Sequence, residues 1–542
     1  MNAFAALLDR LACEPGRNAK LRLLADYFAR TPDPDRGYAL AAMTGALSFA
    51  NARPALLRML IAERVDPALF ALSYDFVGDL AETIALLWPA GAAQAQAPRL
   101  GAIVETLRMI GKHDLPRQLC AWLDALDETG RWALLKLITG ALRIGVSARL
   151  AKTAVASLGA LAADDIEEVW HGLAPPYAAL FAWAAGQGPR PAGDDPAPFR
   201  PPMLAHALNE AALAEMTPAE FVAEWKWDGI RVQAVIGQGA GEVRVVRLYA
   251  RSGDEVTKSF PDLAEALDTA ALAGTTLDGE LLVMRGGLVQ SFNALQQRLN
   301  RKTVTAKRIA GYPAHIRAYD ILTQAGEDLR ALPLRERRVR LERRVAAAAL
   351  ACLDLSPLIA FADWAELARA RKIPAEAGAA RDAAAIEGIM LKRADSAYLP
   401  GRPAGQWFKW KRDPFNIDAV LMYAQRGHGK RSSFYSDFTF GVWREGASGG
   451  ELAPVGKAYF GFTDDELKQL DRFVRDNTTE RFGPVRAVAQ SLVLEIAFEG
   501  LARSTRHKSG LAMRFPRIAR IRWDKPAAEA DRIETLEAML EP

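Results

Sequence analysis

The sequence predicts a multidomain protein in which an all-α region, an α+β region and a small β-barrel follow one another. Three observations support this order. Apolar residues recur at helical spacing to about residue 185, a Pro- and Gly-rich stretch fills 186–202, and short strand-like runs with Gly-rich turns begin after residue 412. With 542 residues, the chain is long enough for roughly three or four domains of ~150 residues each.

Residues 1–185 show the pattern of successive helices. Alanine is abundant, and Pro or Gly falls mostly between the apolar stretches, where helices end. Apolar side chains at helical spacing occur at Phe4, Leu7, Leu8 and Leu11 and again at Leu134, Leu135, Leu137 and Ile138. The stretch 186–202 has the composition of a linker, so we place a domain boundary there.

The pattern changes after this linker. Strand-like runs over 231–236 and 243–249 flank a Gly-rich turn, and a third run covers 277–283. Helices are expected over 263–270 and 335–349. Residues 203–412 are therefore predicted to form an α+β domain.

A second boundary is expected at Asp413-Pro414. Beyond it, short strand-like runs separated by Gly-rich turns cover 419–423, 434–443 and 492–498. Short strands of this kind predict a small β-barrel over 413–542.

The composition argues against a membrane protein and against a cysteine-built one. Half of the residues are hydrophobic, and no apolar run is long enough to cross a bilayer. The N-terminus has no basic lead-in, so we expect the first helix of a cytoplasmic protein there, not a signal peptide. Cys13, Cys120 and Cys352 lie far apart without any Cys-x-x-Cys, which makes a disulfide framework or a zinc site unexpected. A metal should therefore bind oxygen ligands, which favours magnesium or manganese.

One lysine stands in a suggestive setting. Lys226 follows Glu224 by two positions, precedes the turn Asp228-Gly229 and is followed by Arg231. A lysine amine attacks phosphorus only in its neutral form, so its neighbours would have to favour that form and hold it in line with a phosphate. Lys-x-Asp-Gly alone also occurs in unrelated surface turns.

Segments further along the chain supply the other groups that such a lysine would need. Asp278-Gly-Glu280 ends a hydrophobic run with two acids, and Glu387-Gly388 precedes another strand-like run. On a strand, Lys409 and Lys411 would share one face, with Phe408 and Trp410 on the other. Each pattern alone is also typical of a surface turn or an edge strand, but together they offer metal ligands and phosphate-binding cations.

In this order, the segments resemble the signature of covalent nucleotidyltransferases, the superfamily of ligases and capping enzymes. Lys226-x-Asp228-Gly229 is similar to motif I. The later motifs are matched in turn by Arg251-Ser-Gly253 for Ia, Asp278-Gly-Glu280 for III, Tyr319-Asp320 for IIIa, Glu387-Gly388 for IV, Lys409-x-Lys411 for V and Arg514-Phe-Pro516-Arg517 for VI.

Within that superfamily, the closest resemblance is to the ATP-dependent DNA ligases. Glu224 before the lysine is typical of enzymes that read adenine, and the stretches 328–337 and 498–510 are similar to theirs. The helical region resembles their DNA-binding domain, most clearly over 138–145. The resemblance covers nearly the whole chain and implies a helical DNA-binding domain, an adenylation domain and a C-terminal OB-fold barrel.

The resemblance also implies roles for single residues. Lys226 would attack the α-phosphate of ATP to give lysyl-AMP, with Lys409, Lys411 and Arg231 favouring the neutral amine and neutralising phosphate charge. Glu280 and Glu387 would bind ribose or Mg²⁺ (or Mn²⁺). Contacts with the nucleotide are further implied for Glu224 at the adenine amino group, Tyr319 and Met390 on the two faces of the base, and Arg251, Arg514 and Arg517.

Nicked double-stranded DNA is the partner that the resemblance implies. Gly140 and Gly145 would let main-chain N–H groups approach its phosphates, and Arg143 or Lys152 would add positive charge. Arg514 and Arg517 lie on the barrel, which in the family swings away after the first step, so we place a hinge at 412–414. No feature indicates a membrane or an oligomer, and we expect a monomer near the nucleoid, with a chemistry that serves repair, recombination and replication alike.

Other interpretations make different predictions. An RNA ligase or a capping enzyme shares Lys-x-Asp-Gly and the two glutamates, but the long helical region and Glu224 argue against both. An NAD-dependent ligase would need a cysteine zinc cluster, which the sequence lacks. A non-catalytic DNA-binding protein with a degenerate transferase core would lack competent residues, whereas each catalytic position here holds one.

Overall fold

The structure is a computed structural model, and it divides the chain into two compact units. One unit comprises Met1–Leu161, Ala174–Pro189 and Asp413–Pro542, and the other comprises Ala162–Leu173 and Arg190–Arg412. The residues described are 1–542 except 90–96, 141, 192–194, 240–242, 300, 302, 427–433, 447–448, 483–484, 506, 508 and 541–542.

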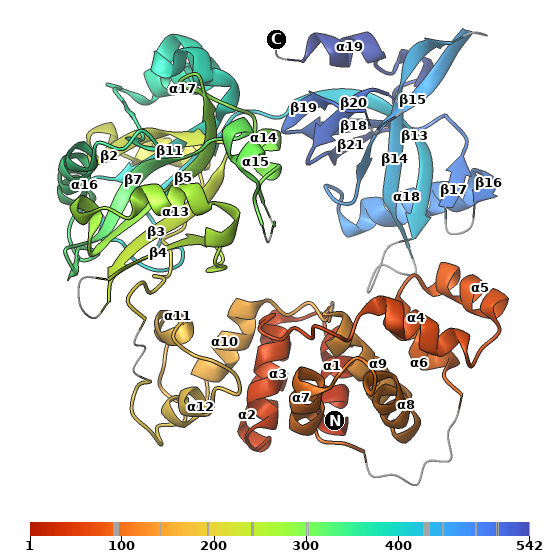
Figure 1. Cartoon of the computed structure of the whole chain (residues 1–542). Helices are drawn as coiled ribbons and strands as arrows, with labels where there is room; N and C mark the ends of the chain where they lie inside the picture. The colour runs from red at the N-terminus through yellow and green to blue at the C-terminus, as the bar shows by residue number, and fades with distance from the viewer. Residues whose placement is uncertain are drawn as a thin grey trace. The chain divides into compact units, whose positions relative to one another are not determined.

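The N-terminal part is helical, as predicted (Figure 1). Phe4, Leu7, Leu8 and Leu11 are buried along one face of the first helix. The helices are α1 (Asn2–Cys13), α2 (Arg17–Arg30), α3 (Asp35–Met43), α4 (Pro54–Ala62), α5 (Pro67–Val77), α6 (Leu80–Leu87), α7 (Leu100–Met109), α8 (Leu115–Ala125), α9 (Glu128–Thr139), α10 (Ala148–Ala156), α11 (Ala163–Trp170) and α12 (Ala178–Ala184).

Helix α11 belongs to the unit that also contains the middle of the chain. Glu168 on this helix accepts a hydrogen bond from Arg330 at 3.1 Å, and the His171 ring lies 4.7 Å from that of Tyr249. Part of the predicted linker packs there as well, because the Tyr249 hydroxyl donates to the Ala197 carbonyl at 2.8 Å and Phe199 is buried. Residues 192–194 of that linker lie outside the described residues.

Two mixed sheets form the middle of the chain. The first has the strand order β1-β12-β11-β2-β10, and the second β4-β3-β5-β7-β8, with β6 and β9 paired to β5 and β7. The first is built from β1 (His206–Ala207), β2 (Phe221–Trp227), β10 (Leu358–Ile359), β11 (Ile386–Arg393) and β12 (Trp407–Lys411). The second is built from β3 (Ile230–Gln238), β4 (Arg244–Ala250), β5 (Thr275–Arg285), β6 (Leu288–Val289), β7 (Ala314–Gln324), β8 (Glu327–Asp328) and β9 (Leu353–Leu355).

Alternation along the strands divides each sheet into an apolar face and a polar one. In the second sheet, Val232 and Leu277 pack with the helices α13 and α16 into one core. In the first sheet, Trp225 and Trp410 pack with α17 into another. The polar faces carry the site residues, and Lys392 of the first sheet lies 4.3 Å from the ring centre of Tyr319 in the second. The helices of this part are α13 (Pro261–Leu267), α14 (Phe292–Gln296), α15 (Ala306–Gly311), α16 (Leu334–Ala348) and α17 (Trp364–Lys372).

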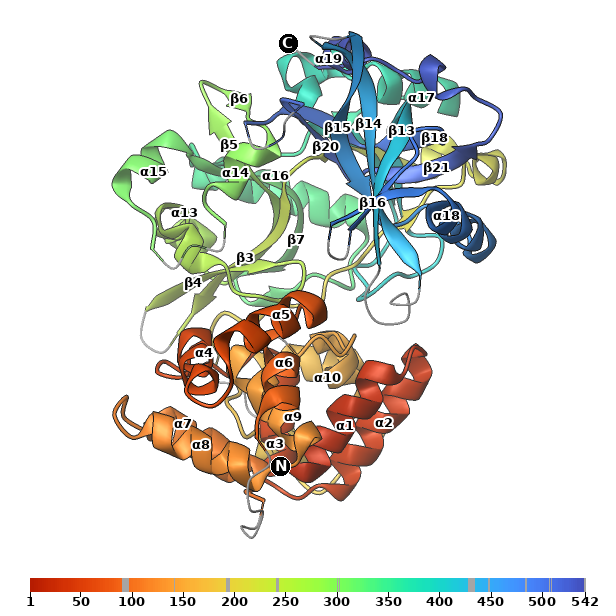
Figure 2. The same cartoon turned by 90° about the vertical axis from the view of Figure 1, so that its right-hand side faces the viewer.

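The C-terminal part is rich in β-strands, as predicted, and Figure 2 shows β13, β14 and β15 side by side. Its main sheet is antiparallel throughout the described pairings, with β18 joining β13 to β21. Helix α18 begins with a capping box between Thr463 and Glu466 and packs Leu470 into the core beside this sheet. The assignment of this sheet to an OB fold stays a prediction. The elements are β13 (Phe415–Arg426), β14 (Tyr435–Gly446), β15 (Gly449–Ala458), α18 (Asp464–Asp476), β16 (Thr478–Phe482), β17 (Val485–Val488), β18 (Val493–Phe498), β19 (Gly500–Arg503), β20 (Leu511–Arg514), β21 (Arg517–Arg522) and α19 (Ile533–Ala538).

Across the described ranges, every helix is too short or too polar to cross a membrane.

Candidate active site

Lys226 lies on the polar face of β2, together with Glu224. Its Cα is paired with that of Gly388 on β11, next to an irregularity in the register between Ile386 and Gly388. This irregularity lies beside Glu387, whose carboxylate oxygen contacts the Lys226 ammonium. Both side chains keep about a fifth of their surface exposed, 22% for Lys226 and 20% for Glu387, so a ligand can reach them.

Two glycines near Lys226 are needed because backbones approach closely. At Gly388, where φ is +148°, a Cβ atom would lie 2.3 Å from the Trp410 carbonyl oxygen on β12. At Gly229, a Cβ atom would lie 2.6 Å from the Leu281 carbonyl oxygen on β5. Gly229 and Gly388 therefore allow the neighbouring strands to approach β2 and β11 closely, next to Lys226.

Glu280 on β5 faces the same space from the second sheet. Burial raises its pKa from 4.5 to about 8, the positive charges of Lys226 and Arg231 lower it, and the negative charge of Glu387 raises it. Of the two predicted metal-binding acids, Glu387 contacts Lys226 directly, and Glu280 is influenced by the charges of both. Two carboxylates that crowd one another in a partly buried site form the oxygen-rich environment that a hard divalent cation fits.

Arg231 is held in a different way from the one the sequence suggested. Its guanidinium donates to Asp278 through Nε at 3.0 Å and Nη2 at 2.6 Å, and to the Met203 carbonyl oxygen at 2.6 Å. The Tyr398 hydroxyl accepts from it at 3.1 Å and donates to Asp278 at 2.7 Å. Burial lowers the pKa of Arg231, but Asp278, Tyr319 and Tyr398 together outweigh burial and raise the pKa above its ordinary value. These hydrogen bonds hold the Arg231 guanidinium against Asp278 and the Met203 carbonyl oxygen. A contact between Arg231 and phosphate stays a prediction.

Two of the residues predicted to bind the base, Glu224 and Met390, lie on neighbouring strands. Glu224 also contacts a lysine that the sequence analysis did not identify. Glu224 is 2% exposed, and its Cα is paired with that of Met390 on β11. Lys392 donates to Glu224 Oε1 at 3.1 Å. Its ammonium nitrogen lies 4.3 Å from the centre of the Tyr319 ring. Period-two alternation from Met390 could have indicated Lys392.

A group of cations faces Lys226 from β12 and the loops beside it. Lys409 is paired with Met390 across the sheet, and Lys411 with Gly388. The pKa of Lys409 is lowered, first by burial and then by the positive charges of Arg402, Lys411, Lys226 and Arg251. The charge of Arg251, a residue that the motif resemblance assigned to the nucleotide, therefore acts on Lys409. Arg402 acts on Lys409 in the same way, and the sequence analysis did not identify it.

Arg514 and Arg517 belong to the other compact unit and are described by themselves. They flank the exposed Phe515, whose φ of +51° turns the chain between β20 and β21. The guanidinium of Arg514 lies 5.3 Å from the Phe515 ring centre, and Arg517 is 4.0 Å from Glu499. Their contacts with the nucleotide stay predictions.

The predicted DNA-binding residues lie around a loop between α9 and α10. Gly140 ends α9 with φ +69°, while Arg143 and Gly145 also have positive φ. The buried Lys20 donates to the carbonyl of Ile144 in this loop. Lys152 is only 4% exposed, so its ammonium points into the protein and the structure gives no support for a contact with phosphate. Ala141 lies outside the described residues.

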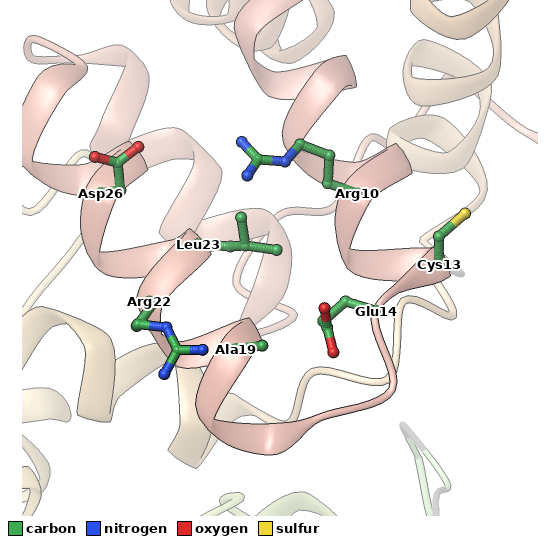
Figure 3. A pocket seen from close by; sticks show the side chains of 7 residues that line it. All are labelled: Arg10, Cys13, Glu14, Ala19, Arg22, Leu23 and Asp26. Atoms are coloured by element: carbon green, nitrogen blue, oxygen red, sulfur yellow. The ribbon is translucent and has the colours of Figure 1, made fainter.

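A hollow at the helices α1 and α2 is separate from all of these residues (Figure 3). Its side chains carry both signs of charge, and none of them is among the predicted site residues. They are Arg10, Cys13, Glu14, Ala19, Arg22, Leu23 and Asp26.

Comparison with known proteins agrees with this geometry. The family model of the ATP dependent DNA ligase domain matches residues 202–411, and that of the ATP dependent DNA ligase C terminal region matches residues 431–525. A probable DNA ligase of Anaeromyxobacter sp. (strain Fw109-5) is 33% identical over 438 residues, which are 78% of this chain and 78% of that protein.

Two further comparisons define how far the similarity extends. A probable DNA ligase of Koribacter versatilis is 37% identical over 347 residues, covering 61% of this chain but only 58% of that protein. The chain thus spans less than two thirds of that relative. The solved structure titled Pmar-Lig_PreS3 has 14% identity and a TM-score of 0.56, covering 96% of this chain and 99% of that one, and it supports the fold alone. From the two family models and these relatives, the chain belongs to the family of ATP-dependent DNA ligases.

Proposed function

We propose that the protein seals nicks in duplex DNA at the expense of ATP, through a lysyl-AMP intermediate on Lys226. One observation carries the proposal. The Lys226 amine contacts Glu387 and its charge acts on Glu280 and Lys409, while the buried Glu224 lies two residues away on the same face of β2. A nucleotide bound there would have its phosphates beside the amine and its base beside the carboxylate.

In the first step, the neutral amine of Lys226 attacks the α-phosphorus of ATP. A nitrogen–phosphorus bond forms, the bond from that phosphorus to the bridging oxygen breaks, and pyrophosphate leaves with its electron pair. The positive charges of Lys409 and Lys411 would stabilise the negative charge that builds up on the phosphate oxygens.

Recognition of the base is assigned to Glu224, Tyr319 and Met390. A carboxylate only accepts hydrogen bonds, so Glu224 suits the exocyclic amino group of adenine. An aromatic ring and a thioether suit the two faces of a flat heterocycle. This supports ATP over GTP as the donor.

Glu280 and Glu387 would hold Mg²⁺ or Mn²⁺. Among the described residues, no group of three His, Cys, Asp or Glu side chains is spaced to hold a metal ion, so phosphate oxygens and water would complete the shell. A bound ion would supply positive charge to the phosphates. The displacement of Glu387 from the Lys226 ammonium would accompany this binding.

In the later steps, a 5′-phosphate oxygen of the nick takes the adenylyl group from Lys226, and the 3′-hydroxyl then displaces AMP. The helical domain would grip the duplex near the loop that carries Gly140, Arg143 and Gly145, through salt-dependent contacts with phosphates. All the groups of the adenylation step lie on one chain, which supports a monomer. A DNA substrate supports a location in the cytoplasm, at the nucleoid.

The test is covalent labelling with α-labelled ATP, GTP or NAD in the presence of Mg²⁺, followed by denaturing electrophoresis. Label should come from ATP, be absent in Lys226→Ala and be discharged by nicked duplex DNA. Lys372→Ala is the matched control, because Lys372 is an exposed lysine of the same unit at the end of α17. Label from GTP would favour a capping enzyme, discharge only by nicked RNA would favour an RNA ligase, and no label at all would refute the proposal.

A further inference from the structure

Lys392 is a buried lysine that the proposed reaction does not use directly. It is 2% exposed, and its ammonium donates a hydrogen bond to Glu224, which is 2% exposed itself. Its ammonium nitrogen lies 4.3 Å from the Tyr319 ring centre and 4.7 Å from that of Trp407. The lysine therefore contacts both the carboxylate and the aromatic wall assigned to the base.

Stability alone does not explain this pair. Moving a carboxylate and an ammonium out of water is costly, and a buried ion pair is often no better than two apolar residues of the same size. The two aromatic rings offset part of the cost on the lysine side. A buried ion pair at a ligand site is better explained by what it fixes in place.

The pair fixes the orientation of the Glu224 carboxylate, because Lys392 holds one of its two oxygen atoms. An ionised carboxylate only accepts hydrogen bonds, whereas a protonated one also donates. Adenine offers an amino group at its six position, and guanine offers a carbonyl oxygen at the same place. The Glu224 carboxylate therefore accepts from the amino group of adenine and repels the carbonyl oxygen of guanine.

We propose that Lys392 is a positioning residue for base selection, which engages Oε1 of Glu224 so that Oε2 is presented to the amino group of adenine. This inference rests on the proposed function. It concerns the choice between nucleotides and leaves the bond-making steps to Lys226 and the residues around it.

The neighbouring residue provides a matched control. Arg393 is the next residue of β11, and its guanidinium points to the exposed carboxylates of Glu220 and Asp395. Both Lys392→Met and Arg393→Gln remove one positive charge from the same strand. Only Lys392→Met removes a charge that contacts Glu224.

The experiment measures self-adenylation of the full chain with ATP and with GTP, and sealing of a nick that already carries AMP. Lys392→Met should raise KM for ATP by about tenfold or more with a smaller change in kcat, and lower the preference for ATP over GTP by a similar factor. Sealing of the pre-adenylated nick should stay within about twofold, because that step does not select a free nucleotide. Arg393→Gln should match the wild type in all three measurements.

A double variant keeps the test decisive if Lys392→Met folds poorly. In Glu224→Gln, the carboxylate is already gone, so adding Lys392→Met should not change the preference between ATP and GTP further. An equal loss with ATP and GTP in Lys392→Met, or a further loss of preference in the double variant, would overturn the inference. A wild-type protein that takes no label from ATP would instead refute the proposed function.

Discussion

Glu280 should make the stability of the middle domain fall as the pH rises. Burial raises the pKa of this carboxyl group from 4.5 to about 8, against the opposing effects of Lys226 and Arg231. In an unfolded chain, the same group would titrate near its ordinary value. The folded and unfolded states therefore bind different numbers of protons between these two pKa values.

The sign follows from which state keeps the proton. Below the unfolded pKa of 4.5, the group is protonated in both states, so its full contribution to stability is present and does not change with pH. Between 4.5 and about 8, the unfolded chain has lost its proton while the folded domain retains it, so each rise in pH favours unfolding. Over this window the loss amounts to roughly 5 kcal/mol, at about 1.4 kcal/mol per tenfold change in proton affinity. Water that relaxes around the carboxylate makes this an upper bound.

Glu280→Gln removes the titration and keeps the shape of the side chain. Urea unfolding followed by tryptophan fluorescence, at about pH 5, 6.5 and 8, should show a stability advantage of the variant that grows with pH. The other domains should unfold at the same urea concentration in the wild type and in Glu280→Gln. The difference between the two proteins therefore reports on the middle domain. Glu336→Gln, on an exposed position of α16, is the control and should show no such trend. A difference that is constant across the pH range would refute the reasoning.

Three further predictions concern the fold and the first step. Arg337→Leu should destabilise the chain by about 3–5 kcal/mol, because it strands the fully buried carboxylate of Asp320, 2.8 Å away. Arg340→Gln breaks an exposed ion pair and should cost less than about 1 kcal/mol in the same urea unfolding, so equal losses would contradict the argument. Gly388→Ala should abolish labelling by ATP in a protein with unchanged circular dichroism, because its Cβ would collide with the backbone of β12, and normal labelling would contradict this. Arg514→Ala should impair self-adenylation more than the sealing of a pre-adenylated nick, and an equal loss in both assays would count against a role in the first step.

Local pattern was sufficient to predict which face of a strand carries chemistry. The alternation of Lys409 and Lys411 with Phe408 and Trp410 predicted two faces, and in the structure the aromatic residues pack into a core while the lysines pair across the sheet with Met390 and Gly388. This pattern depends only on the period of a strand. The helix over 335–349 was predicted on the same kind of local evidence, and α16 spans Leu334–Ala348.

Partners that lie far apart in the sequence could not be predicted in this way. Arg231 meets Asp278 because β3 and β5 pair in one particular register, and Glu224 meets Lys392 across 168 positions of the chain. No local period contains that register. The burial of Lys152 is a similar case, because it depends on which neighbouring helices pack against α10 and not on a local pattern.

The exposure of the three ion pairs of the site separates their roles. In Lys392–Glu224, both side chains are at most 3% exposed, and in Arg231–Asp278 the carboxylate is 2% exposed, so neither pair can exchange its partner for a ligand without leaving a buried charge alone. In Lys226–Glu387, both side chains are exposed by a fifth or more, and water or a ligand can take the place of either. The pair that can open at low cost is the one that contains the nucleophile. The two buried pairs are therefore rigid, and we expect phosphate and metal to bind at the exchangeable pair.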